Sequence, residues 1–274
     1  MQRTRGGSMT VTEEETVAVL YEERDGIAYV TLNRPQAMNA INMRMLDELE
    51  KIAETIRSHD TVKAAIVRGS GGRAFSAGAD LKELQRENMM DDAGKHLIFS
   101  ARLRDALTSV EQIPVPVVAV IEGYAFAGGL ELALCCDVII CASDAQISDQ
   151  HANRNLIAGG GGTQRLPRRI GIQRAMELLF TGRRLTGDEA VAYGIALLAV
   201  PSVELDAEVE RFVEQFRSKS RVGLSYMKEL VKRGMELPLR EGLDLERLLV
   251  QEYFSCFPDA KGGVQAFNAS RPGA

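Results

Sequence analysis

Short apolar runs alternate with helical patterns up to residue 200, and this alternation constrains the fold more than any other feature of the chain. The runs typical of buried strands are IAYVTL (27–32), AAIVRG (64–69), VVAVIEG (117–123), DVIICA (137–142) and AQIS (145–148). Residues 42–59, between the first two runs, carry apolar side chains at helical spacing. Strands separated by helices pair in parallel, because a helix is the usual crossover. The pattern therefore predicts an α/β fold with a mostly parallel sheet.

The pattern changes after residue 170, where helical segments dominate and IALLAV (195–200) is the one late strand. No low-complexity linker divides the chain. We therefore expect a core over residues 13–200 and a helical C-terminal region over residues 201–274, which covers the core or forms subunit contacts. Residues 1–12 lack the apolar segment of a secretory signal, and we expect them to be a disordered leader.

Composition excludes several classes of protein. The 274 residues carry a formal net charge of −5, whereas a nucleic-acid binder usually has a basic face. Charges and glycines interrupt every apolar run before the ~20 residues that a membrane helix needs. Three of the four cysteines lie in one apolar stretch, without the paired spacing of a zinc site. We expect buried free thiols, a cytoplasmic location, no metal, and neither a nucleic-acid nor a membrane partner.

Two glycine-rich turns lead from apolar strands into helices. In GSGGRAFSAGADLKEL (69–84), Asp80 is placed to cap a helix, and such a turn can receive an anion or a polarised carbonyl. In EGYAFAGGLELALCCD (122–137), Gly128 and Gly129 allow a ligand to approach the backbone. The alternative for both is a tight turn without a ligand.

Glu131 is the one charged residue in the apolar helix that follows the second turn. Burial would raise the pKa of this carboxyl, and the helix N-terminus would lower it. A carboxyl held between these effects suits general acid–base catalysis. A structural carboxylate paired with an arginine is the alternative.

The stretch ISDQHANRNLIAGGGGTQ (147–164) holds one of three histidines beside a run of glycines. The glycine run is not a phosphate loop, because Gln164 and Arg165 stand where that motif has Lys and Ser or Thr. If residues 147–151 are extended, Asp149 and His151 face the same side, and the aspartate can orient the imidazole. A lone histidine is more often structural, so both interpretations stay open.

Five segments in the same order resemble the crotonase superfamily, the enoyl-CoA hydratase/isomerase family. They are TLNRPQAMNAINMRMLDEL, RAFSAGADLKEL, IEGYAFAGGLELALCCDVIICA, GGGGTQRLPRRIG and FPDAKGGVQAFNASRP. The resemblance implies a spiral of ββα turns with a helical C-terminal region, assembled as a homotrimer or a dimer of trimers. It also implies an acyl-CoA thioester substrate, so that coenzyme A arrives with the substrate and no separate cofactor is expected.

The resemblance also implies roles for residues. The backbone N–H groups of Ala79 and Gly128 would form an oxyanion hole for the thioester oxygen. The segments that would line the coenzyme A site are Ala37, Met38, Ala79, Asp80, Leu81 and Lys82, with Phe267 and Arg271 at the adenine end.

The catalytic positions include one departure from the family pattern. Glu131 matches the first hydratase glutamate, but His151 stands at the position of the second, twenty residues after Glu131 and twelve before Thr163. His151 titrates near neutrality and can share the acid–base work, with Asp149 setting its tautomer. We expect enoyl-CoA hydration, with enoyl-CoA isomerisation or hydrolysis of an acyl-CoA or β-diketone as alternatives. A non-catalytic acyl-CoA-binding protein is the alternative of another class.

Overall fold

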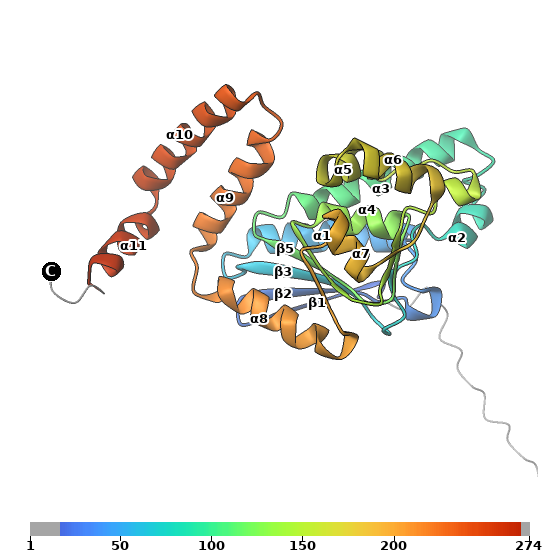
Figure 1. The fold of residues 1–274 in the computed structure, drawn as a ribbon, viewed down its shortest axis with the longest axis horizontal. Helices are drawn as coiled ribbons and strands as arrows, with labels where there is room; N and C mark the ends of the chain where they lie inside the picture. The colour runs from blue at the N-terminus through green and yellow to red at the C-terminus, as the bar shows by residue number, and fades with distance from the viewer. Residues whose placement is uncertain (1–16, 270–274) are drawn as a thin grey trace, which may run out of the picture.

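A computed structural model describes residues 17–269 and contains two sheets stacked within one spiral (Figure 1). The expected leader, residues 1–12, lies outside the described residues. The six-stranded sheet has the order β1 (Val19–Arg24), β2 (Ile27–Leu32), β3 (Ala64–Gly69), β5 (Val117–Ile121), β7 (Val138–Ala142) and β10 (Leu198–Val200). The four-stranded sheet has the order β4 (Ala74–Ser76), β6 (Tyr124–Phe126), β8 (Gln146–Ser148) and β9 (Leu185–Thr186).

Each turn of the spiral places one strand in each sheet and then a helix. β3 leads into β4, β5 into β6, and β7 into β8, and these strands are parallel to their counterparts in the next turn. Helices follow each pair: α2 (Leu81–Arg86) and α3 (Ala93–Glu111), then α4 (Gly128–Cys135), then α5 (Gly162–Ile170) and α6 (Ile172–Thr181). The ends of β4, β6 and β8 therefore lie side by side, and the segments that follow them meet in space.

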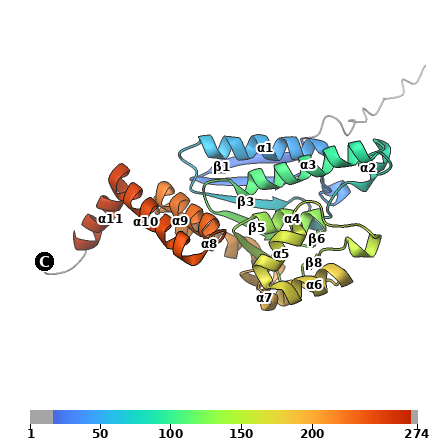
Figure 2. The ribbon, with the colours of Figure 1, turned by 90° about the horizontal axis from the view of Figure 1, so that it is seen from above.

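The expected helix over residues 42–59 is α1 (Met43–Ser58), which packs against α3 (Figure 2). Asn42 caps its first turn by accepting a hydrogen bond from the Met45 backbone N–H. The buried positions follow the predicted apolar face: Met45, Leu46, Leu49, Ala53 and Ile56. This face fixes α1 on the six-stranded sheet and so fixes the loop that precedes it.

The sequence pattern missed the shortest strands. β4, β6 and β9 have only two or three residues, which is too few for a periodic signal, and β1 is largely exposed. β9 also means that the run 195–200 is not the one late strand. Only residues 198–200 of that run pair, as β10.

The helices after β9 divide into two groups. α7 (Gly187–Tyr193) precedes β10, and α8 (Leu205–Arg217) lies across the half-buried face of the six-stranded sheet, where Tyr29 Oη donates to Glu210 Oε2 at 3.2 Å. The second group is α9 (Arg221–Gly234), α10 (Leu239–Cys256) and α11 (Pro258–Ala269), which pack on one another and stand away from the spiral (Figure 1).

Cysteine burial follows the expectation for the apolar stretch. Cys135, Cys136 and Cys141 are buried and free, and Cys256 is free and exposed. Burial raises the pKa of Cys135 and Cys141 to about 12, which keeps both thiols protonated. None of the described helices combines the length and apolarity needed to cross a membrane.

Candidate active site

A cavity of about 1070 Å³ opens at the carboxyl ends of β4, β6 and β8. It brings together residues that the sequence analysis proposed from three separate segments. Those in its lining are Ala37, Met38, Ala79, Asp80, Leu81, Lys82 and His151. Size and lining both suit a ligand larger than a simple metabolite.

Two loops beside the cavity are joined by backbone hydrogen bonds. Ile41 N–H donates to Gly78 O at 2.8 Å, and Asp80 N–H donates to Ile41 O at 2.8 Å. These two bonds use the Gly78 carbonyl and the Asp80 N–H, the groups on either side of Ala79. The Ala79 N–H has no acceptor among the described residues and faces away from the partner loop.

Asp80 caps α2 as expected, accepting hydrogen bonds from the Lys82 and Glu83 backbone N–H groups. Arg34 Nη1 lies 2.8 Å from Asp80 Oδ2. Burial works against the charged carboxylate, but the hydrogen bonds and charge of Arg34 and the two amides outweigh it and hold the pKa of Asp80 below its ordinary value. The ion pair ties the Arg34 turn to the start of α2.

The amides of Ala79 and Gly128 lie close together. A Cβ added at Gly128 would stand 3.5 Å from Ala79 N, and one added at Gly78 would stand 3.0 Å from Gly128 N. Gly128 begins α4, so its N–H has no partner within the helix, and none is found elsewhere among the described residues. Ala127, just before it, has φ of 48° and ψ of −118°, a strained backbone that turns β6 into α4.

Glu131 is 1% exposed in a helix whose eight residues are all buried. Its Oε1 accepts a hydrogen bond from Gly162 N–H at 2.8 Å, and its Oε2 has no hydrogen-bond partner within the part of the chain that the structure describes. Burial raises the pKa of Glu131, although the Gly162 and Gly160 backbone act in the other direction. No arginine pairs with this carboxylate among the described residues, so the arginine pairing offered as the structural alternative is not found there.

His151 and Asp149 form a buried pair. His151 Nδ1 lies 3.0 Å from Asp149 Oδ1, and the two side chains are 14% and 3% exposed. The extended conformation supposed for residues 147–151 is wrong. β8 ends at Ser148, and His151 has helical dihedral angles. A turn through Gln150, which has φ of 59°, brings the imidazole back to the carboxylate.

A carboxylate only accepts hydrogen bonds, so Nδ1 of His151 donates to Asp149. Nε2 of His151 has no partner among the described residues. Burial would lower the pKa of His151, but the hydrogen bond and charge of Asp149, with the charge of Glu131, outweigh it and raise that pKa above its ordinary value. His151 and Glu131 each shift the pKa of the other, so the two groups act as one electrostatic unit.

Several residues at the site were not identified from the sequence. Gly162 supplies the N–H that holds Glu131, and Gln150 donates from Nε2 to Ser148 Oγ and Gly182 O, both at 2.9 Å, which fixes the turn before His151. Neither carries a motif that a single sequence reveals. Four arginines also line the cavity: Arg34, Arg44, Arg86 and Arg154.

The two C-terminal residues predicted for the adenine end stay predictions. Phe267 belongs to α11, which lies at the opposite end of the molecule from α2 (Figure 1), and Arg271 lies outside the described residues. The described residues also contain no group of three or more His, Cys, Asp or Glu side chains that suits a metal ion.

Comparison with known proteins gives consistent matches over nearly the whole chain. The family model described as enoyl-CoA hydratase/isomerase matches residues 22–273. A probable mitochondrial enoyl-CoA hydratase of Dictyostelium discoideum is 36% identical over 91% of this chain and 87% of its own length. The mitochondrial methylglutaconyl-CoA hydratase of Mus musculus is 35% identical over 98% and 86%, respectively.

Solved structures agree in fold. The crystal structure of enoyl-CoA hydratase from Bacillus anthracis has a TM-score of 0.88 at 33% identity, over 93% of this chain and 97% of that one. An enoyl-CoA hydratase structure from Mycobacterium smegmatis has a TM-score of 0.87 at 30% identity, over 93% and 97%. The spiral of ββα turns with helices at the C-terminus is thus the crotonase fold, and the chain belongs to the enoyl-CoA hydratase/isomerase family.

Proposed function

We propose that this protein hydrates a 2-enoyl-CoA thioester. One observation carries the proposal: the free Oε2 of buried Glu131 and the free Nε2 of His151 accompany two close amides, those of Ala79 and Gly128, that have no acceptor. Two close N–H groups without acceptors suit a thioester oxygen that gains negative charge. The two titratable groups suit the proton transfers that accompany this charge.

Water addition uses each group once. Glu131, as a carboxylate, takes a proton from water while the water oxygen bonds to the β-carbon. The electron pair of the C=C bond moves toward the thioester oxygen, where the Ala79 and Gly128 amides stabilise the enolate. His151, as an imidazolium, then donates its Nε2 proton to the α-carbon. The proton that Glu131 took then returns to His151 Nε2, which restores the carboxylate and the imidazolium. Protons and charges then balance over the whole cycle, and the reaction needs only the protein, water and the thioester.

The raised pKa values support this division of roles. A buried Glu131 with a raised pKa is a stronger base than a solvated carboxylate, and its ion shares the site with a cation. A raised pKa keeps His151 protonated over more of the neutral range. Before water is added, hydration requires a negatively charged base and a positively charged acid, which are Glu131 and His151 in this proposal.

Hydrolysis of the acyl-CoA is the second candidate, and the His151–Asp149 pair is the observation that favours it. A neutral imidazole oriented by a carboxylate can deprotonate water for attack on the thioester carbonyl. The same two amides would stabilise the resulting oxyanion. The raised pKa of His151 works against a neutral imidazole, so hydration is the better-supported reaction.

The first test is loss of crotonyl-CoA absorbance with the wild type and with Glu131→Gln. We expect turnover by the wild type and a fall in kcat of about 10³-fold or more in Glu131→Gln, because the base is removed. A parallel mass-spectrometric screen of enoyl, β-keto and saturated thioesters separates hydration from hydrolysis. Turnover of a saturated thioester with none of any enoyl thioester would contradict hydration.

We also propose that the protein works as a homotrimer or a dimer of trimers. α9–α11 bury only one apolar side chain, that of Leu249, among their described residues. Their exposed apolar residues include Met227, Val231, Leu239, Leu243, Leu248 and Phe254. Contiguous apolar exposure of this kind marks a protein interface.

A further inference from the structure

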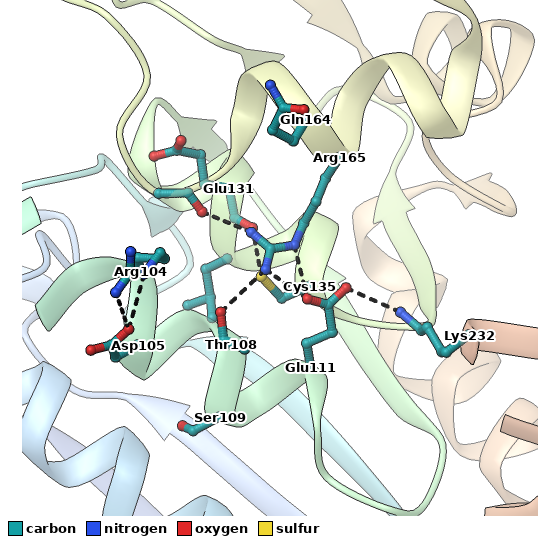
Figure 3. A network of polar contacts seen from close by, with 12 residues as sticks. Arg104, Asp105, Thr108, Ser109, Glu111, Glu131, Cys135, Gln164, Arg165 and Lys232 are labelled. Carbon is teal, nitrogen blue, oxygen red and sulfur yellow. Dashed lines mark hydrogen bonds and ion pairs between the residues drawn. The ribbon is translucent and has the colours of Figure 1, made fainter. Parts of the chain in front are cut away.

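A chain of polar contacts leads from the C-terminal helices to the loop that holds Glu131 (Figure 3). Glu111 ends α3, Arg165 lies in the first turn of α5, and Lys232 lies in α9. Arg165 donates from Nε and Nη2 to Glu111 Oε2 at 3.0 and 2.6 Å. Lys232 Nζ lies 3.4 Å from Glu111 Oε1. The proposed reaction leaves this cluster without a role.

Arg165 also binds the glycine loop directly. Its Nη1 donates to Gly160 O at 2.8 Å, and a Cβ added at Gly161 would stand only 2.0 Å from Nη1. The guanidinium therefore packs directly against the backbone of the loop. Because its two other nitrogens are fixed by Glu111, the planar group holds the loop at a set distance from α3.

The opposite side of the same loop touches Glu131. A Cβ added at Gly160 would stand 2.7 Å from Glu131 Oε2, and one added at Gly162 would stand 3.2 Å from Oε1. The Gly162 N–H is the hydrogen bond that orients the carboxylate. A small shift of the loop would therefore change both the direction of Glu131 and the strength of this bond.

The ion pair of Arg165 and Glu111 is partly shielded from solvent and has further charged neighbours. Arg165 and Glu111 are 18% and 25% exposed, and Arg165 keeps the pKa of Glu111 below its ordinary value even though burial opposes this. From α9, Lys232 lies 3.5 Å from Asp137 Oδ1. A buried arginine paired in this way has few alternative positions, so it makes a rigid support.

We propose that Arg165 and Glu111 are positioning residues, which hold the Gly160–Gly162 backbone so that Glu131 keeps one oxygen bonded and one free. The inference rests on the proposed function, in which Glu131 is the base. Lys232 extends the support into α9, so the docking of that helix is linked to the geometry of the carboxylate.

The test compares Arg165→Met, Glu111→Gln and Lys232→Met with a matched control, Arg102→Met. Arg102, in α3 like Glu111, pairs with Asp47 and Glu50 of α1 at 2.6 and 2.7 Å instead of with the glycine loop. The measurements are kcat and KM against pH and, without turnover, the ¹³C NMR titration of the Glu131 carboxyl. Glu131→Gln assigns the NMR signal.

We expect Arg165→Met to lower the pH-independent kcat by about 10–100-fold with KM within about twofold, because misplacement of a catalytic group has this effect. The acid limb and the Glu131 titration should move to higher pH, because the Gly162 N–H opposes the raised pKa. Glu111→Gln should act in the same direction and Lys232→Met more weakly. Arg102→Met should lower stability alone.

An unchanged kcat, pH profile and Glu131 titration in a folded Arg165→Met protein would overturn the proposal and leave a merely structural ion pair. Failure of the proposed function gives a different pattern. In that case the wild type neither turns over nor binds acyl-CoA by calorimetry, while the NMR titration of Glu131 still reports whether Arg165 positions it.

Discussion

His151 and Asp149 act as a unit, and their contact gives a pH dependence with a definite sign. The pKa of His151 is raised because Asp149 outweighs burial. If the imidazolium is the proton donor, activity falls as the pH rises through this pKa.

Asp149→Asn should therefore move the basic limb of the kcat profile to lower pH. Burial then remains as the main influence on His151 and lowers its pKa. His151→Gln should remove the basic limb and lower kcat by about 10²–10⁴-fold. Stopped-flow or steady-state rates across the pH range test both. A basic limb that is the same in Asp149→Asn and wild type would show that another group sets it.

The sequence could identify Glu131 because a carboxylate in an apolar helix is a local signal. It could suggest the contact of Asp149 with His151 but not its cause, since the turn at Gln150 depends on hydrogen bonds to Gly182, which is remote in sequence. The role of Gly162 was hidden for the same reason. An N–H that holds a side chain thirty-one positions away leaves no local pattern.

At the scale of elements, the close packing of α4 on β4 determines where the proposed oxyanion hole lies. Gly129 lies against the end of β4, and a Cβ there would stand 2.3 Å from Ser76 O. Gly129 and the Ser76 carbonyl both belong to the backbone, so neither can rotate away as a side chain could. α4 therefore has one position on the small sheet, and Gly128 has one position beside Ala79.

Gly129→Ala should destabilise the protein by about 1–3 kcal/mol or prevent folding, because the packed core has no room for the methyl group. Gly234→Ala is the matched control, since a Cβ there meets nothing within 4 Å at the end of α9. We expect it to be neutral or slightly stabilising. Urea unfolding monitored by circular dichroism compares the two. Equal midpoints would contradict the close packing.

The long elements were predictable because their signals repeat. α1 lies within its expected range, 42–59, and β2 and β3 each begin and end at the predicted residues. These elements were predictable because amphipathic faces and buried runs extend over several residues. In the small sheet, β8 was expected within AQIS (145–148), but β4, β6 and β9 were not predictable. They exist because neighbouring turns of the spiral supply their hydrogen bonds, which is a property of the assembled fold.

At the scale of the whole molecule, α9–α11 form an arm that leaves many apolar side chains exposed among the described residues. α9 is anchored to the spiral mainly by charged groups: Lys228 Nζ lies 2.7 Å from Asp137 Oδ2, and Arg221 Nε donates to Val62 O at 2.9 Å. Such anchors orient the arm but bury little apolar surface. Association of copies would cover the rest.

Leu239→Glu with Leu243→Glu should shift the protein toward a monomer of 30.0 kDa in sedimentation velocity. These side chains are 80% and 55% exposed on α10, and a buried charge at an interface is strongly unfavourable. Arg240→Gln with Glu241→Gln on the same helix is the control and should leave the assembly intact. A wild type that sediments as a monomer would contradict the assembly itself.

The spiral also separates the tasks of the site among its turns. The end of β4 supplies Ala79, the end of β6 supplies Gly128 and Glu131, and the end of β8 supplies Asp149 and His151. In the proposed mechanism, substrate activation thus belongs to two turns, while the second proton-transfer group belongs to a third. We therefore expect a single replacement after β8 to change the reaction without disturbing how the thioester is activated, so that such a scaffold could diversify by exchanging one turn at a time.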